Sequence, residues 1–307
     1  MYKRNKNHFT AAVIAVISMG VTSGGAFAGG LLDVEFGDVP FGAPLVVDNP
    51  YWPLKPDNHS RTFTYIGETE DECVIDQISV NDNFYGATYN LTGDAPYGGL
   101  TALQVVDTEW VFEDVEECSL DLLLEPGSHE AIKEFTLDWY MQDDQENIWY
   151  VGEKSQNYEE DGCGTFGDVR DPELFPQCFE GSWEAGIVGG EDDEAVTGEA
   201  GIVVPGDHPI AGEPLKTGAY YMQEVAFEAE DMAKILRQHA SLSVEDGVEP
   251  GEYEKCRKAK EWTAQEPGGS VEHKWYCADG PGLVLIEGVG GGPTEVEVLV
   301  DVSPALP

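Results

Sequence analysis

The sequence predicts a mainly-β protein, built as a single curved antiparallel sheet (a half-barrel or open barrel) with one short helix and long acidic loops. From residue 61 onward, short runs rich in β-branched and aromatic residues alternate with turn-forming residues, as strands do. The chain also contains 7 Trp, 13 Tyr and 12 Phe, enough to build a core. Because one flat sheet cannot bury both of its faces, the sheet must curl around the helix and loops or stack as a sandwich.

Eight segments carry the strand pattern: 62–66, 73–80, 103–112, 134–141, 147–151, 271–276, 283–287 and 295–302. In the last of them, Val296, Val298, Val300 and Val302 occupy every second position. This alternation predicts a half-buried strand with the four valines on one face.

The polar segment 142–147 lies between two Trp-Tyr runs and predicts a β-hairpin. A turn centred on the middle of this segment places Trp139 opposite Tyr150, and Tyr140 opposite Trp149. We expect one pair in the core and the other on the open concave or solvent face, where it is a candidate for ligand contact.

Residues 228–239 form the one predicted helix. Acidic residues occupy its first turn and basic residues its last, which complements the helix dipole. Met232, Ile235 and Leu236 would form its apolar face.

The chain is expected to contain a signal peptide (1–28), an extended leader (29–56) and a single mainly-β domain (57–307) with a loop-rich insertion at about 155–216. The first segment combines basic residues, an apolar run and the cleavage motif Ala26-Phe27-Ala28. A membrane anchor would need ~20 mostly apolar residues, and glycine and polar residues interrupt this run too early. We therefore expect a secreted or periplasmic protein that begins at Gly29 and keeps no membrane anchor.

The formal charge of −43 excludes some partners. Nucleic acids require a basic surface, which the sequence lacks, and an anionic membrane surface would repel the chain. Adaptation to salt explains such a charge best, because salt screens the repulsion within a few ångströms. A diffuse, weak attraction for Ca²⁺ is an alternative.

Six cysteines in an exported chain predict three disulfides. Fifteen pairings are possible, and the simplest is sequential: Cys73 with Cys118, Cys163 with Cys178, and Cys256 with Cys277. The cysteines are too far apart in sequence for a C-x-x-C metal site, and the histidines form no H-x-x-x-H motif. We predict neither a metal centre nor a cofactor.

Two acidic segments have candidate Ca²⁺ ligands. The turn at 142–147 lacks the glycine and the terminal bidentate acid of a calcium loop, so a solvated turn is the preferred interpretation. The cluster 191–194 lies in a glycine-rich loop and is interpreted as a solvated loop.

Aromatic strand residues are the candidate ligand contacts: Trp139, Tyr140, Trp149, Tyr150 and Trp275. They could stack on a sugar or line a lipophilic cleft, although core filling of a curved sheet is the preferred interpretation of aromatic strand residues. No nucleophile motif is present. A set of acids around one histidine is the alternative catalytic candidate: Glu153, Glu184, Glu272 and His273.

Several phrases of the sequence occur together in a known group of proteins. They are Asn49-Pro-Tyr-Trp-Pro-Leu-Lys-Pro56, Asp138-Trp-Tyr-Met-Gln-Asp143, Asn147-Ile-Trp-Tyr-Val-Gly-Glu153, Gly181-Ser-Trp-Glu-Ala-Gly186, Ala229-Glu-Asp-Met-Ala233 and Glu272-His-Lys-Trp-Tyr276 followed by Gly282-Leu-Val-Leu285. In this combination the chain resembles an uncharacterised family of bacterial secreted proteins with no assigned activity. The segments that carry Cys163, Cys178, Cys256 and Cys277 depart from that family's pattern, and no catalytic residue can be carried over.

The leading hypothesis is a secreted or periplasmic, non-enzymatic protein that binds a small or hydrophobic molecule through its curved sheet. A hydrolase with an acid/base pair in the cleft of the sheet is one alternative. A calcium-responsive surface protein with low affinity is another.

Overall fold

A computed structural model of the protein describes residues 29–41, 46–55, 61–68, 72–80, 85–113, 115, 117–159, 161–168, 170–190, 195–227, 229–244, 251–263, 269–290 and 296–304. The predicted signal peptide and the acidic cluster at 191–194 lie outside these residues.

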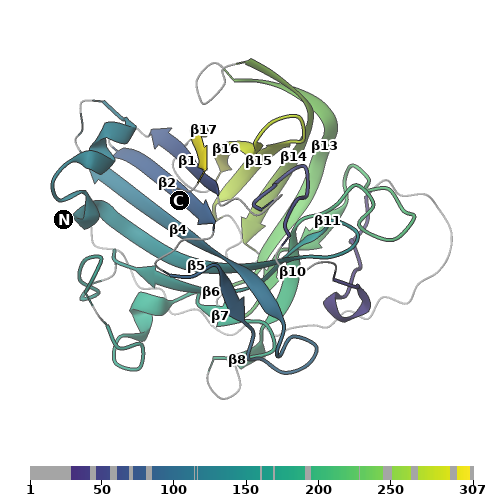
Figure 1. The fold of residues 1–307 in the computed structure, drawn as a ribbon, viewed down its shortest axis with the longest axis horizontal. Coiled ribbons are helices and arrows are strands. Elements are labelled where there is room, and N and C mark those ends of the chain that lie inside the picture. The colour runs from purple at the N-terminus through teal and green to yellow at the C-terminus, as the bar shows by residue number, and fades with distance from the viewer. Residues whose placement is uncertain are drawn as a thin grey trace.

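Within this part of the chain the structure is mainly β (Figure 1). The strands are β1 (Arg61–Glu68), β2 (Glu72–Val80), β3 (Thr88–Asn90), β4 (Thr101–Glu113), β5 (Ile132–Gln142), β6 (Ile148–Asn157), β7 (Trp183–Glu184), β8 (Val188–Gly189), β9 (Val196–Thr197), β10 (Glu199–Val204), β11 (Tyr220–Met222), β12 (Glu224–Val225), β13 (Asp231–Val244), β14 (Gly251–Thr263), β15 (Val271–Cys277), β16 (Gly282–Gly290) and β17 (Val296–Pro304). Four short 3₁₀ turns accompany them: η1 (Phe36–Asp38), η2 (Leu120–Leu124), η3 (Ser128–Ala131) and η4 (Pro176–Phe179).

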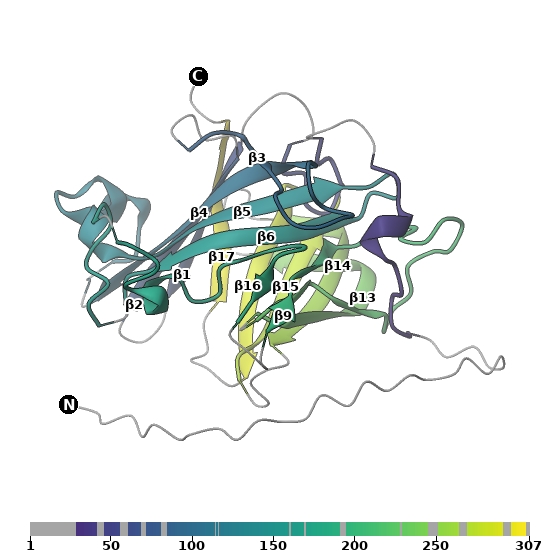
Figure 2. The same ribbon diagram turned by 90° about the horizontal axis from the view of Figure 1, so that it is seen from below.

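The main sheet is antiparallel and nearly closed, which confirms the predicted curved sheet. Its order is β11-β13-β14-β15-β16-β17-β1-β2-β4-β5-β6-β10-β12. The two ends of this order belong to one short segment, 220–225, because β11 pairs with β13 and β12 pairs with β10. The segment 220–225 is therefore a seam that brings the edges of the sheet together, and Figure 2 shows the strongly bent sheet from a second side.

The predicted helix at 228–239 is wrong. Residues 231 to 239 belong to the long strand β13, which pairs with β14 over most of its length. Ala233 and Ile235 of this strand are buried, while its acidic and basic ends gave it the appearance of a capped helix. Tertiary pairing overrides such a local signal, because helix propensity is a weak bias. No helix in the described ranges is long and apolar enough to cross a membrane.

The hairpin between β5 and β6 exists, but its predicted register is wrong. Tyr140 pairs with Tyr150 and Met141 with Trp149, with an irregularity between Trp139 and Tyr140 where Gly152 is accommodated. The turn contains one residue more than expected, because the backbone of Asp143 bonds to that of Asn147. As a result, the two tryptophans share one face of the sheet and the two tyrosines share the other.

The described part of the predicted leader packs into the protein. Val47, Tyr51, Trp52 and Leu54 are buried in the larger core cluster, which also contains Tyr140. Hydrogen bonds from the backbone of residues 48 and 49 to the side chain of Gln142 fasten the leader to the end of β5. The leader thereby fills part of the interior of the curved sheet.

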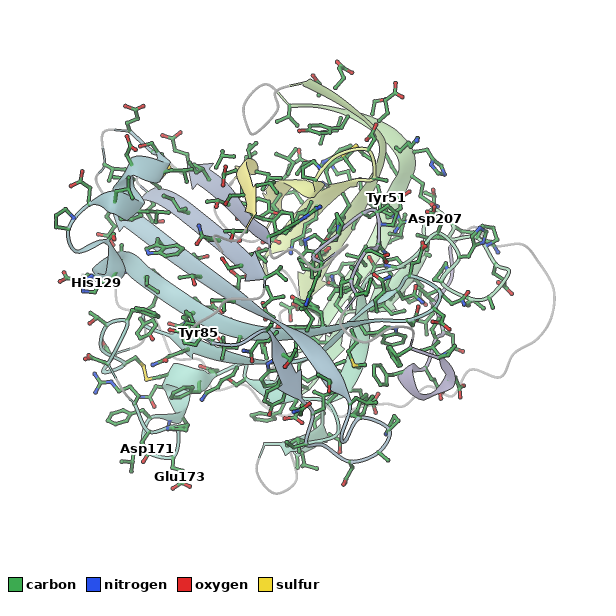
Figure 3. The ribbon with its side chains drawn as sticks, viewed as in Figure 1. Tyr51, Tyr85, His129, Asp171, Glu173 and Asp207 are labelled. Atoms are coloured by element: carbon green, nitrogen blue, oxygen red, sulfur yellow. A yellow bond between two sulfur atoms is a disulfide. The ribbon has the colours of Figure 1, made fainter. Side chains whose placement is uncertain are left out.

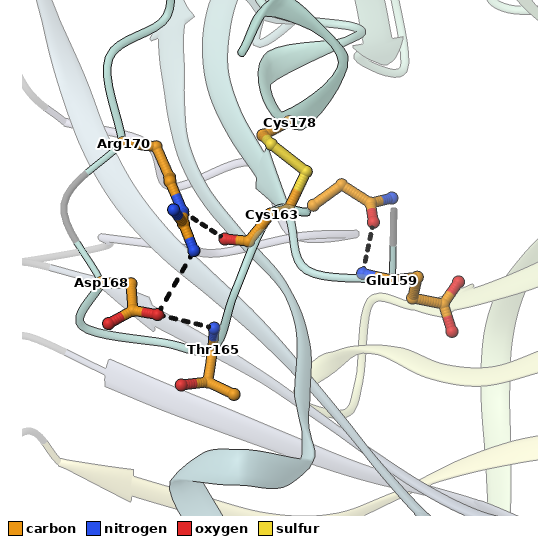
Figure 4. The surroundings of a disulfide bond; sticks show 7 residues. Glu159, Cys163, Thr165, Asp168, Arg170 and Cys178 are labelled. Carbon is orange, nitrogen blue, oxygen red and sulfur yellow. Dashed lines mark hydrogen bonds and ion pairs between the residues drawn. A yellow bond between two sulfur atoms is a disulfide. The ribbon is translucent and has the colours of Figure 1, made fainter. Parts of the chain in front are cut away.

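Three disulfides are formed, in the sequential pairing: Cys73–Cys118, Cys163–Cys178 and Cys256–Cys277. The second one secures the predicted loop-rich insertion (Figure 4). Close to it, the Arg170 side chain donates to the carbonyl of Cys163 at 2.9 Å and forms an ion pair with Asp168 at 3.5 Å. The insertion is less irregular than expected, since it also contains the short strands β7 to β10.

Removing the third disulfide should destabilise the fold. Cys256 and Cys277 are opposite residues of β14 and β15 and are separated by 21 positions. A loop of this length corresponds to about 3 kcal/mol of stabilisation in the loop-entropy model. We expect Cys256→Ser/Cys277→Ser to lower the free energy of unfolding in urea by about this amount. An unchanged value would show that strand pairing alone closes this loop.

A candidate binding site inside the curved sheet

The inner face of the sheet surrounds a cavity of about 350 Å³ whose lining is strongly acidic. Eleven carboxyl groups line it: Asp76, Asp107, Glu109, Glu134, Asp138, Glu153, Glu224, Asp231, Glu261, Glu272 and Glu297. Among the described residues that line it, Lys274 is the only basic one. Cavities of roughly 300–1,000 Å³ hold small molecules in proteins, so this one fits a ligand at the small end of that range.

Strand register places several of these carboxyl groups directly opposite one another. The opposed pairs are Asp76 with Glu109, Glu109 with Glu134, Asp138 with Glu153, and Glu261 with Glu272. Like charges at directly opposed positions destabilise an antiparallel sheet. Positive charge from a lysine, from protons or from a ligand therefore has to compensate them.

A tyrosine joins two of the opposed carboxyl groups. The Tyr150 hydroxyl lies 2.6 Å from Asp138 Oδ1 and 2.9 Å from Glu153 Oε2. A hydroxyl donates one hydrogen, so one of the two carboxyl groups must itself donate and carry a proton. Burial raises the pKa of both Asp138 and Glu153 well above the usual range, and repulsion from Asp107 adds to the rise for Asp138, as repulsion from Asp138 does for Glu153. The pair shares protons in the absence of a cation.

Two further carboxyl pairs lie on other strands of the same interior. Burial, followed by repulsion from Glu297, raises the pKa of Asp76 to about 7, although a hydrogen bond with Asp107 opposes the rise. At the seam, burial and then the neighbouring charge of Asp231 raise the pKa of Glu224 to about 8. Burial likewise raises the pKa of Asp107 well above its normal value. Proton-holding carboxyl groups thus occur around the interior and not at one point.

The positive charge of Lys274 is already balanced by two carboxylates. Its ammonium group lies 3.1 Å from Glu261 and 3.5 Å from Glu272. Burial disfavours its charge, but these two carboxylates overcome that effect and raise the pKa of Lys274 well above its usual range. Glu261 also accepts a hydrogen bond from the Tyr276 hydroxyl at 3.1 Å.

Aromatic rings form one wall of the cavity. Tyr140 and Tyr150 stack with ring centroids 5.0 Å apart, and Trp52 from the leader meets Tyr140 edge-on at 5.3 Å. Carboxylates beside aromatic faces are the two chemical features that attract organic ammonium groups, through ion pairing and through cation–π attraction.

The five predicted ligand contacts are divided between the two faces of the sheet. Tyr140 and Tyr150 line the cavity. Trp139 and Trp149 belong to a core cluster on the other face, where Trp139 stacks on Tyr89 with centroids 3.8 Å apart. Trp275 lies outside the cavity lining and donates to Glu287 at 2.7 Å. Ligand contact by these residues remains a prediction.

The alternative catalytic set is not assembled. Glu153 and Glu272 line the cavity, but His273 is not part of the lining, because side chains alternate along β15. Glu184 accepts hydrogen bonds from Tyr89 and from the backbone of residues 92 and 93, which fixes the loop after β3.

The turn at 142–147 is solvated only in part: Asp144 and Glu146 are exposed, whereas Asp143 and Asn147 on either side of its centre are buried. Asp143 is 3 % exposed and accepts from the backbone of Gln145 and Asn147, from the Asn147 amide and from the Trp149 indole. These four bonds occupy both carboxylate oxygens of Asp143. Across the described ranges, no three His, Cys, Asp or Glu side chains converge closely enough to hold a metal ion.

The acidic interior was missed by the sequence analysis, although a signal for it exists. In β5, Glu134, Thr136, Asp138 and Tyr140 alternate with apolar residues, and such alternation is normally interpreted as a polar face toward solvent. In a sheet that curls on itself, the polar face can instead turn inward.

Comparisons with known proteins leave the family open. No protein-family profile matches the chain, and no curated protein matches it. Among solved structures, a Bacteroides fragilis protein described as exported, with a YmcC-like fold, aligns at 10% identity and a TM-score of 0.33, over 81% of this chain and 97% of its own. A protein from Parabacteroides distasonis described as a lipoprotein aligns at 9% identity and a TM-score of 0.26, over 87% and 100% of the two chains. The resemblance to the bacterial secreted family remains a prediction.

Proposed function

We propose that this protein is a secreted or periplasmic, non-enzymatic binding protein that holds a small organic cation inside its curved sheet. One observation carries the proposal: eleven carboxyl groups and one lysine line a single cavity. The export signal predicted from residues 1–28 supports the location. The acidic lining favours a cation over the hydrophobic ligand that the aromatic strands had suggested.

An organic cation fits the cavity better than one compact ion. The carboxyl groups come from strands around the whole interior and do not converge on one point. Several ammonium groups on one molecule could each meet a carboxylate, and the aromatic wall could contact the carbon framework. Weak binding of Ca²⁺ to the acidic surface remains a separate prediction.

Calorimetry with putrescine and spermidine at pH 7 and near-physiological salt tests the proposal. We expect saturable binding of one molecule per chain. Because charge-assisted hydrogen bonds are strong, Asp138→Asn/Glu153→Gln should weaken binding at least roughly tenfold.

A matched control separates the cavity from the general negative charge of the chain. Glu130 and Glu173 are exposed, and Figure 3 shows Glu173 at the periphery of the molecule. The variant Glu130→Gln/Glu173→Gln removes the same number of carboxyl groups and should bind as the natural protein does. Equal weakening in both variants, or binding without saturation, would contradict the proposal.

A further inference from the structure

The cavity lining contains hydrogen-bonding groups that a purely hydrocarbon cation would leave unused. Trp52 is 7 % exposed and lines the cavity, and its buried indole nitrogen has no hydrogen-bond partner among the residues that the structure describes. A buried polar group without a partner is costly, so native proteins rarely contain one without a reason. An indole N–H only donates, so its missing partner is an acceptor atom.

A second neutral group supports this conclusion independently. Gln223 is 7 % exposed, lines the cavity and separates β11 from β12 at the seam. Its backbone N–H donates to the Asp231 carbonyl at 2.8 Å, so the side-chain amide is the polar group that Gln223 contributes to the lining. An amide both donates and accepts, which suits a hydroxyl group.

From these groups we infer that the ligand is an amine-bearing sugar, or a similar hydroxylated amine of one or two rings. The inference rests on the proposed function and makes it more specific. Ammonium groups would meet the carboxylates, an oxygen would accept from the Trp52 indole, and a hydroxyl would bind the Gln223 amide. The aromatic wall formed by Tyr140 and Tyr150 would contact a ring face.

Three probes of matched size or charge test the inference at pH 7. The β-1,4-linked disaccharide of glucosamine carries two amines and several hydroxyls, putrescine carries two amines alone, and the N-acetylated disaccharide carries hydroxyls without a charge. We expect the glucosamine disaccharide to bind roughly tenfold more tightly than putrescine, which is the effect of one or two additional hydrogen bonds.

Two variants assign this preference to the cavity. Trp52→Phe keeps an aromatic ring but removes the N–H, and Gln223→Met keeps the size of the side chain but removes the amide. Each should reduce the affinity ratio of the disaccharide over putrescine severalfold. Melting temperatures of both variants identify a folding defect. If one variant is defective, the affinity ratio measured with the other variant still tests the inference.

The outcomes separate the two proposals. Equal affinity for the disaccharide and putrescine, or a ratio that both variants leave unchanged, overturns the inference but leaves cation binding intact. Binding of the N-acetylated disaccharide as tightly as the free amine, or of no probe at all, overturns the proposed function as well.

Discussion

Raising the pH from 5 to 8 without a ligand should lower the free energy of unfolding of this protein by several kcal/mol. The effect comes from interior carboxyl groups that hold protons in the folded protein. Burial and neighbouring charges raise the pKa of Asp76 from 3.8 to about 7, and that of Glu224 from 4.5 to about 8. In the unfolded chain both groups lose their protons near the lower values.

The sign follows from proton counting. Between about pH 4 and pH 8 the folded protein binds more protons than the unfolded chain, so stability falls as pH rises. For each group that keeps this extra proton, the free energy of unfolding falls by about 1.4 kcal/mol per pH unit. The stability that these groups contribute is fully present below the unfolded pKa and is lost as pH rises through the folded pKa.

Urea unfolding at pH 5, 6, 7 and 8 measures this slope. The variant Asp76→Asn/Glu224→Gln keeps hydrogen-bonding side chains but cannot lose the protons, so its curve should be flatter and its stability at pH 8 higher than that of the natural protein. The surface variant Glu130→Gln/Glu173→Gln reports the contribution of general repulsion. If the interior and surface variants change the slope equally, the interior carboxyl groups are not its cause.

The same protons connect stability to ligand binding. A cation that replaces them must displace protons at pH 6 but few at pH 8, so cation affinity should rise over this interval. Because a ligand that binds only the folded state stabilises it, a saturating cation should restore much of the stability lost at pH 8. The acidic interior would then lower the free energy of unfolding only when no cation is bound.

The architecture was accessible from the sequence because strand patterning and turn residues are local. Strands such as β5 and β15, with aromatic and β-branched residues between turn signals, were recognised directly. The strand β13 was mistaken for a helix, since its acidic start and basic end match helix capping and its pairing with β14 is invisible to a local reading.

The site was harder to predict than the fold. Alternation shows that Asp138 and Trp139 face opposite sides of β5, but not which side becomes the interior once the sheet curls. Closure of the sheet depends on the seam at 220–225, whose two halves pair with strands far apart in the sequence. The opposed carboxyl pairs require the register of each strand, and a single-residue error in the β5–β6 turn was enough to place one tryptophan and one tyrosine on each face instead of both tyrosines on the inner face.

That turn provides the second large expected effect: Asp143→Ala should lower the free energy of unfolding by about 4 kcal/mol. The Asp143 carboxylate accepts four hydrogen bonds between 2.8 and 3.0 Å, and the residue is buried. Removing it leaves buried donors on Asn147 and Trp149 without partners, and each costs about 1–3 kcal/mol. Urea unfolding measures the loss. Asp144 is exposed in the same turn, so Asp144→Ala is the control and should change stability by no more than about 0.5 kcal/mol.

Asp143→Ala should also weaken cation binding, although Asp143 does not line the cavity. Its bonds to the backbone of Gln145 and Asn147 hold the turn that makes Tyr140 pair with Tyr150. A change of one residue in this register would turn one of the tyrosines away from the cavity and separate the Tyr150 hydroxyl from Asp138. Equal stability losses in the two alanine variants, or a destabilised Asp143→Ala protein that binds putrescine with natural affinity, would show that strand pairing alone fixes the register and that the buried carboxylate only stabilises it.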